Sequence, residues 1–262
     1  MTAGPGASGT AGSPADSVRP AVPVAGSAVP RLVVVTDRRQ AERAGRSLVE
    51  VVAAAVSAGA GAVLLREKDL PPAARRSLAA ELRAVLAPAG GRLIVSGDVG
   101  LARRSGAGVH LSATDPWPAA GPRSAARPGA GVGPQVALVG RSCHTVDELR
   151  EARARGAGYA TLSPVFPSPS KPGYGPAVGL DGLAAACAAV PDLPVVALGG
   201  IGPGTAAPCL AAGARGVAVM GAVMGAGDPA AVVRTLLAEL GATASSGPTG
   251  SATVRPVAGA GR

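Results

Sequence analysis

The fold of this chain is decided by one short string that occurs four times, as AGAGAV (58–63), SGAGVH (105–110), RGAGYA (155–160) and AGARGV (212–217). In each copy the second residue is a glycine, and a run that is mostly small or aliphatic follows it. Glycine in this position is typical of a helix end, and the aliphatic run is typical of a buried strand. The copies recur about every 50 residues, which fits two strand–helix units per interval. The repeat therefore predicts about eight strands that alternate with helices.

The predicted strands are short and almost continuously apolar. They cover residues 31–36, 62–66, 92–96, 108–111, 136–140, 159–163, 194–198 and 216–220. Strands buried on both faces have this composition, and such strands usually pair in parallel. Eight parallel strands that close on themselves form a (βα)8 TIM barrel in the α/β class, which is the fold we predict. The alternative is an open doubly wound sheet, but residues 36–39 (TDRR) lack the glycine-rich turn that usually follows its first strand.

Segments between the strands predict helices and set the domain boundaries. The predicted helices cover residues 40–58, 71–87, 98–105, 145–155, 180–190, 205–212 and 228–240. The segment 112–134 is too rich in proline and glycine for a regular fourth helix. We therefore expect one barrel domain over residues 31–240, a disordered N-terminal extension over 1–30 and a disordered C-terminal tail over 241–262.

The composition excludes several classes of protein. The 262 residues carry a formal net charge of +9, but the basic residues are scattered and aromatic residues make up only 2% of the chain. Nucleic-acid binding usually needs clustered basic residues and aromatic side chains, so we expect a small anionic ligand and no nucleic acid. No apolar stretch is long enough for a membrane span, and we expect no membrane partner. Three cysteines without CxxC spacing fit the reducing cytoplasm, where we expect the protein.

Two strand ends are rich in glycine, and in a barrel the active site lies at the carboxyl ends of the strands. Strand 194–198 is followed by Gly199 and Gly200, and strand 216–220 ends at Met220 before Gly221. Backbone N–H groups after these two strands often bind phosphate in barrels, and glycine lets the anion approach closely. We predict a phosphate site that includes Gly200, Met220 and Gly221. The alternative is that the glycines only form turns.

Charged and polar side chains follow two other strands. Arg66 and Lys68 come at the end of strand 62–66, where they suit an anionic substrate, unless they belong to a solvated turn. Ser142 and His144 follow strand 136–140, and alternation in an extended segment puts them on one side and Cys143 on the other. His144 is a candidate for proton transfer near neutral pH, with a hydrogen-bonded structural histidine as the alternative.

A long segment after strand 159–163 completes the set of candidates. It holds hydroxyls and a cation that could wrap around an anion, namely Ser168, Ser170 and Lys171. The segment is longer than an ordinary connection between a strand and a helix. The alternative is a disordered insertion, although the only phenylalanine of the chain and one of its two tyrosines lie in or beside it.

Seven motifs of this chain, taken in order, resemble those of the thiamine phosphate synthase/TenI family. They are VTDR (35–38), REKD (66–69), GVHL (108–111), GRSCHT (140–145), SPVF (163–166), SK (170–171) and GGI (199–201). Each motif is short, and the specificity lies in their order over residues 31–240. The resemblance implies a (βα)8 barrel of thiamine biosynthesis that binds a thiazole phosphate.

The resemblance implies one of two activities, and the chain departs from the pattern of one of them. The synthase joins a pyrimidine pyrophosphate to a thiazole phosphate with Mg²⁺ and loss of pyrophosphate. The tautomerase aromatises the thiazole phosphate by proton transfer without a metal. The synthase pattern has glutamine where this chain has Leu64, and Asn-Asp where it has Ser96 and Gly97. That aspartate is a magnesium ligand, and a glycine has no side chain with which to replace it.

The remaining motif residues give the expectation for function. Asp115 matches the second magnesium ligand, and Asp98 looks like the first residue of a helix. His144 matches the proton-transferring histidine of the tautomerase, so we expect a tautomerase without cofactor in which Arg66 positions the substrate carboxylate. The alternative is a Mg²⁺-dependent thiamine phosphate synthase in which Asp98 or water replaces the lost ligand. A further alternative is a non-catalytic regulatory protein that binds a phosphate ligand, and in each case the chain could form a homo-oligomer.

Overall fold

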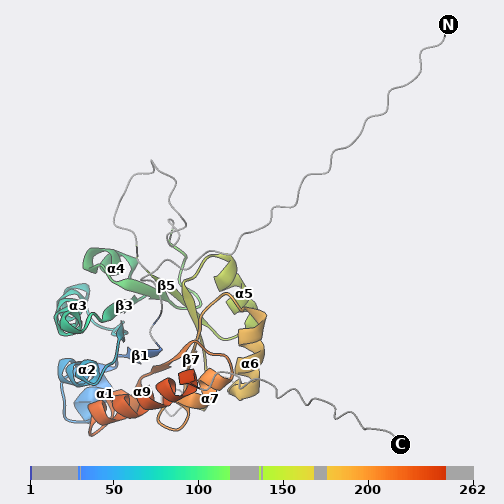
Figure 1. Ribbon diagram of the computed structural model, residues 1–262. Coiled ribbons are helices and arrows are strands. Elements are labelled where there is room, and N and C mark those ends of the chain that lie inside the picture. The colour runs from blue at the N-terminus through green and yellow to red at the C-terminus, as the bar shows by residue number, and fades with distance from the viewer. Residues whose placement is uncertain (2–28, 30, 119–135, 137, 168–175, 246–262) are drawn as a thin grey trace, which may run out of the picture.

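The computed structural model describes residues 1, 29, 31–118, 136, 138–167 and 176–245. Within them, parallel strands pair in the order β1 to β8 into a closed barrel, and β1 also pairs with β8 (Figure 1). The strands are Leu32–Val35 (β1), Ala62–Leu65 (β2), Arg92–Ser96 (β3), Gly108–Leu111 (β4), Val139–Cys143 (β5), Tyr159–Leu162 (β6), Val195–Leu198 (β7) and Gly216–Val219 (β8). The predicted (βα)8 barrel is confirmed.

Helices surround the barrel (Figure 1). They are α1 (Arg38–Arg43), α2 (Leu48–Ser57), α3 (Pro72–Leu86), α4 (Val99–Ser105), α5 (Val146–Ala154), α6 (Gly179–Ala189), α7 (Ala206–Ala211), α8 (Gly221–Met224) and α9 (Pro229–Ser245), with a 3-10 turn at Ala87–Ala89. The described residues between β4 and β5 contain no helix, as their sequence predicted. Among the helices in this part of the chain, none has the length and apolar character that a membrane span requires.

The helix predicted over residues 40–58 is wrong, because the structure has two helices there. α1 ends before Gly45, whose φ of 75° belongs to the left-handed region that favours glycine. α2 then starts with a capping box, in which the Ser47 hydroxyl accepts from the Glu50 N–H and the Glu50 carboxylate accepts from the Ser47 N–H. The Ser-x-x-Glu spacing is the sequence signal for this second helix start.

Two other boundaries also differ from the prediction. Strand β5 begins at Val139 rather than at residue 136, so Arg141 to Cys143 lie inside the strand rather than after it. The apolar run begins before the strand does, since Val136 and Leu138 are buried outside it. Helix α9 continues to Ser245, five residues beyond the expected end of the domain. Of the ends predicted to be disordered, residues 2–28, 30 and 246–262 lie outside the described residues.

The four repeat glycines have the backbone conformation that the repeat predicts. Their φ angles are 106° at Gly59, 61° at Gly106, 75° at Gly156 and 95° at Gly213. L-residues with a side chain rarely adopt these angles, so glycine allows each chain reversal from a helix to the next strand. The repeat therefore sets the spacing of the strands that carry the site.

The core has two parts, one inside the barrel and one between the barrel and its helices. The interior part includes Val33, Leu64, Ile94 and Val196, together with the fully buried ring of Tyr159. A Cβ on Gly140 of the neighbouring strand β5 would lie 2.2 Å from Cε1 and Cζ of that ring. Glycine is therefore required at position 140 by the tyrosine, and the ring fills the space that a side chain there would occupy.

This packing predicts a large effect of a single methyl group. We expect Gly140→Ala to lower the free energy of unfolding by about 3 kcal/mol, because the methyl group overlaps the Tyr159 ring. Gly241→Ala in helix α9 is the matched control: a Cβ there meets no atom within 4 Å, and the change should be neutral or slightly stabilising. Urea unfolding of the two variants and the wild type measures both changes in the free energy of unfolding. Wild-type stability for Gly140→Ala would show that the ring does not occupy this space.

Candidate active site

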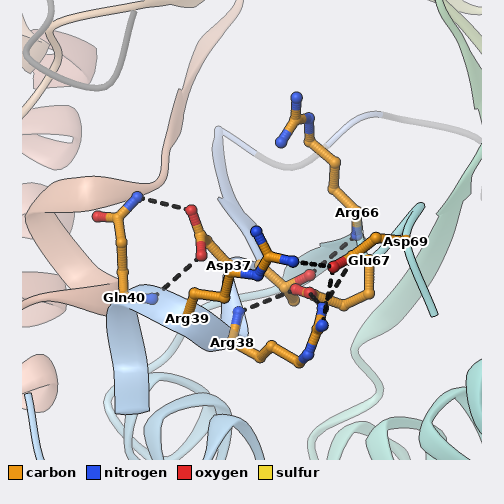
Figure 2. A network of polar contacts seen from close by, with 8 residues as sticks. Asp37, Arg38, Arg39, Gln40, Arg66, Glu67 and Asp69 are labelled. Carbon is orange, nitrogen blue, oxygen red and sulfur yellow. Dashed lines mark hydrogen bonds and ion pairs between the residues drawn. The ribbon is translucent and has the colours of Figure 1, made fainter. Parts of the chain in front are cut away.

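Arginine and acidic residues form a network at the carboxyl ends of β1 and β2 (Figure 2). The carboxylate of Glu67 is buried, with 4% of its side chain exposed, and accepts from the backbone N–H of Arg38 at 3.0 Å and from its guanidinium at 2.8 Å. The same guanidinium donates to both oxygens of Asp69, at 2.7 and 2.8 Å, and Arg39 donates to Asp69 at 2.8 Å. This network fixes the residues that follow β2 against the start of α1.

The network binds the two acids of the REKD motif and leaves its two cations outside. Hydrogen bonds from Arg38 hold the pKa of the exposed Asp69 carboxyl well below its usual range, and Asp69 in turn raises the pKa of Arg38. Arg66 and Lys68 make no ion pair with any described residue, and Figure 2 shows the Arg66 side chain extending away from the network. The arrangement presents cations at a strand end, as an anionic substrate requires.

Lys68 lies beside a carboxylate that comes from a different part of the chain. A Cβ on Gly97 would lie 3.4 Å from Oδ2 of Asp115 and 4.0 Å from Nζ of Lys68. The ends of β2, β3 and β4 therefore meet at Gly97, where the synthase pattern has an aspartate. Among the described residues, no three His, Cys, Asp or Glu side chains form a group that could hold a metal. One carboxylate is available at this point, Asp115, and its Oδ2 also accepts from the Ser112 N–H at 2.7 Å.

The proposed replacement ligand, Asp98, is engaged elsewhere. Its Oδ1 accepts from the Leu101 N–H at 2.8 Å, which makes it the N-cap of α4, as its position in the sequence suggested. Its Oδ2 forms an ion pair with Arg75 at 2.8 Å. With both oxygens bound to its own surroundings, Asp98 is a structural residue rather than a substitute for the missing aspartate.

A buried histidine lies below this cluster, and the sequence reasoning gave it no role. His110 on β4 is 4% exposed, with Nδ1 2.9 Å from the Tyr159 hydroxyl and Nε2 2.9 Å from Oγ of Ser142. Its ring stacks on Tyr159 at 5.4 Å between centroids. The GVHL motif was the available signal, because an imidazole in a buried strand needs polar partners.

The environment of His110 keeps its ring neutral. Burial, and then the positive charge of Lys68, lower its pKa from 6.5 to about 4. Burial also raises the pKa of Tyr159, so that its hydroxyl keeps its proton. The hydroxyl of Thr161, opposite Ser142 on β6, is buried without a hydrogen-bond partner among the described residues. The floor of the site is therefore polar and uncharged, with Ser142 as its link to the histidine.

His144 lies just after β5. Its Nδ1 is 2.7 Å from the carbonyl oxygen of Ser163 at the end of β6. A carbonyl only accepts, so Nδ1 carries the proton, and in the neutral ring Nε2 is the basic nitrogen. Cys143 belongs to the outer core cluster while Ser142 reaches inward, which agrees with the predicted alternation. Burial raises the pKa of the Cys143 thiol to about 12, so it is not a nucleophile at neutral pH.

The glycines of the predicted phosphate site have packing roles as well. Gly200 has a φ of 68°, and a Cβ there would lie 2.6 Å from the Pro167 carbonyl oxygen. Gly221 starts helix α8 after Met220, and a Cβ on Gly221 would lie 3.2 Å from Oε1 of Gln40. Both glycines are at the ends of β7 and β8, as predicted. The other three predicted phosphate ligands, Ser168, Ser170 and Lys171, lie outside the described residues.

The fold and this grouping of cations, carboxylate and imidazoles define a barrel enzyme whose site suits an anionic substrate. The family described as thiamine monophosphate synthase matches residues 32–223. The chain is 43% identical over 197 residues to the "Thiamine biosynthesis bifunctional protein ThiM/ThiE" of Symbiobacterium thermophilum, a match that covers 75% of this chain and only 39% of that protein. It is 41% identical over 210 residues to the "Putative thiamine-phosphate synthase" of Geobacter sulfurreducens, covering 80% of this chain and 93% of the relative.

A solved structure agrees with these relatives. The "Thiamine phosphate pyrophosphorylase from Pyrococcus furiosus" superimposes with a TM-score of 0.66 and 28% identity, over 81% of this chain and 96% of that one. The chain belongs to the thiamine phosphate synthase/TenI family, and the resemblance of its motifs is confirmed. It is an enzyme of thiamine biosynthesis.

The buried His110 predicts a pH dependence of stability. Between pH 6.5 and about 4 the unfolded chain binds a proton that the folded protein does not, so stability falls as the pH falls through this range. The loss should reach about 3 kcal/mol, and stability is restored in full above pH 6.5. Urea unfolding of wild type and His110→Gln at neutral pH and near pH 4 measures this contribution. An equal loss in both proteins would assign the pH dependence to other groups.

Proposed function

We propose that this enzyme is a thiamine phosphate synthase, which joins a pyrimidine pyrophosphate to a thiazole phosphate and releases pyrophosphate. The observation that carries the proposal is the meeting of Lys68 and Asp115 at Gly97. Relatives about 40% identical over most of the chain are named thiamine-phosphate synthases, which supports it. The alternative from the sequence thus becomes the favoured activity.

The charges at this point suit a pyrophosphate. Arg66 and Lys68 present two positive charges that the neighbouring acids do not neutralise, because Glu67 and Asp69 are bound to Arg38. Negative charge develops on pyrophosphate as it leaves, and fixed cations stabilise that charge most in a partly enclosed site. Arg38 and Arg39 belong to the supporting network rather than to the substrate site.

The single carboxylate is compatible with magnesium. Mg²⁺ is often bound through one or two carboxylates together with phosphate oxygens of the substrate, rather than by the protein alone. Asp115 would hold the ion in this chain, and the pyrophosphate would supply other oxygens. When bound, Mg²⁺ neutralises charge on the leaving pyrophosphate. The proposal needs no second carboxylate, and Asp98 is not available as one.

The thiazole phosphate would occupy the opposite half of the barrel mouth. Phosphate sites in such barrels are often built after strands 7 and 8, where Gly200, Met220 and Gly221 lie. Ser142, on β5, lies between the pyrophosphate half and the thiazole phosphate half of the barrel mouth. Its hydroxyl shares a hydrogen bond with Nε2 of His110. The cytoplasmic location and a homo-oligomeric assembly stay predictions.

Thiazole tautomerase is the second candidate. Gly97 stands where the synthase pattern has an aspartate, so one carboxylate of that pattern is absent. The buried apolar Leu64 stands where the pattern has glutamine. His144 has its Nδ1 fixed by the Ser163 carbonyl, which leaves Nε2 as the basic nitrogen for proton transfer. A tautomerase would use this histidine without a metal.

The two activities are separated by supplying the purified enzyme with both synthase substrates and Mg²⁺, and in a second reaction with the thiazole carboxylate phosphate tautomer. We expect magnesium-dependent thiamine phosphate and pyrophosphate in the first reaction. Asp115→Asn should lower that rate by about 100-fold or more, because a fixed charge at the leaving group is lost. Asp147→Asn, whose side chain is 89% exposed on α5, is the matched control and should keep the wild-type rate.

The other outcomes identify the alternatives. Turnover of the tautomer without thiamine phosphate formation, abolished by His144→Ala, would replace the synthase proposal with the tautomerase. Inactivity in both reactions with retained binding of a thiazole phosphate would favour a regulatory protein.

A further inference from the structure

The carboxylate at the centre of the proposed site lies on an irregular segment. Asp115 belongs to residues 112–118, which follow β4 where the described chain has no helix. Within the segment, the Ser112 N–H donates to Oδ2 of Asp115 at 2.7 Å, and the Asp115 N–H donates to the Ser112 carbonyl oxygen at 3.2 Å. These local bonds shape the turn, but they do not tie it to the barrel. Arg141, on the neighbouring strand β5, contacts this segment at three residues.

Arg141 binds the segment at both ends of the turn that carries the carboxylate. One guanidinium nitrogen donates to the carbonyl oxygen of Asp115 and the other to the carbonyl oxygen of Ala113, each at 2.6 Å. The guanidinium also lies 5.0 Å from the ring centroid of Trp117. A second guanidinium, that of Arg155, lies 5.8 Å from the same centroid.

The chemistry of this contact requires arginine. A planar guanidinium can donate to two carbonyl oxygens in a fixed geometry while it lies over an aromatic ring, whereas a lysine ammonium acts as a single point charge. Arg141 precedes Ser142, whose side chain reaches His110 inside the barrel. Strand β5 thus contacts the site in two places. The inward side chain of Ser142 lies at the floor, and the outward side chain of Arg141 contacts the Asp115 segment.

We propose that Arg141 is a positioning residue that holds the turn carrying Asp115 against the barrel, beside Lys68 and Gly97. The proposal rests on the proposed function, because it assigns Asp115 to the metal and pyrophosphate. Arg141 acts on the carboxylate through the backbone at residues 113 and 115 and does not itself contact the ion.

The test compares Arg141→Gln and Arg141→Lys with Arg155→Gln as the matched control. Arg155 contacts the same tryptophan, but its guanidinium pairs with Glu151 and not with the described carbonyls of the segment. For each protein one measures the Mg²⁺ concentration for half-maximal synthase rate, the KM for thiazole phosphate, and hydrogen exchange of the amides at residues 112–117 without ligand. Emission of Trp117, the only tryptophan, reports whether each substitution reaches the ring.

We expect Arg141→Gln to raise the half-saturating Mg²⁺ concentration about tenfold or more, the usual effect of losing a residue that orients a metal ligand. The KM for thiazole phosphate should stay unchanged, the amides should exchange faster, and Arg141→Lys should recover part of the Mg²⁺ response. Arg155→Gln should alter Trp117 emission alone. Unchanged Mg²⁺ dependence in folded Arg141→Gln, or an equal change in Arg155→Gln, would overturn the proposal.

If the wild type makes no thiamine phosphate, the proposed function fails, and hydrogen exchange alone decides the positioning role. Faster exchange at residues 112–117 in Arg141→Gln but not in Arg155→Gln would support it. Equal exchange in the two variants would contradict it.

Discussion

A tyrosine ring inside the barrel is the feature on which the rest of the site depends. The ring of Tyr159 is fully buried, and it fits because Gly140 on the adjacent strand has no side chain. With so few aromatic residues in the chain, this one ring fills space that several aliphatic side chains would otherwise have to fill. Its hydroxyl, kept protonated by burial, meets His110, and His110 meets Ser142 at the floor of the site. Packing at the centre therefore sets the position of the polar groups above it.

The charged residues that the structure describes at the barrel mouth fall into two groups, one paired in ion pairs and one unpaired. Arg38 binds both acids of the REKD motif, and this leaves Arg66 and Lys68 outside these ion pairs. The carboxylate that meets Lys68 at Gly97 is that of Asp115, on the segment after β4. One carboxylate beside an unpaired lysine suits a magnesium pyrophosphate better than a bare metal ion. The loss of an aspartate at Gly97 therefore changes how the metal would be held and does not by itself exclude the synthase.

Much of the fold could be predicted because its signals are local. Each repeat glycine ends a helix in the left-handed region, and each apolar run after it forms a strand. One boundary was wrong because its local signal is ambiguous: the apolar run at 136–140 starts before β5. Another was wrong although a local signal exists, because the Ser47–Glu50 capping box divides a helix that was predicted to be continuous. The contacts of His110 with Tyr159 and of Arg141 with residues 113–117 join residues distant in sequence. A single sequence carries no local signal for such pairs, so they required the structure.

The central claim is that one carboxylate and two cations hold a magnesium pyrophosphate at the ends of β2, β3 and β4. Manganese is a spectroscopic substitute for magnesium, and electron paramagnetic resonance distinguishes bound from free Mn²⁺. We predict that the enzyme binds Mn²⁺ weakly alone and tightly when inorganic pyrophosphate is present, because the pyrophosphate supplies the ligands that the protein lacks. Equal binding with and without pyrophosphate, or no binding in its presence, would contradict the account.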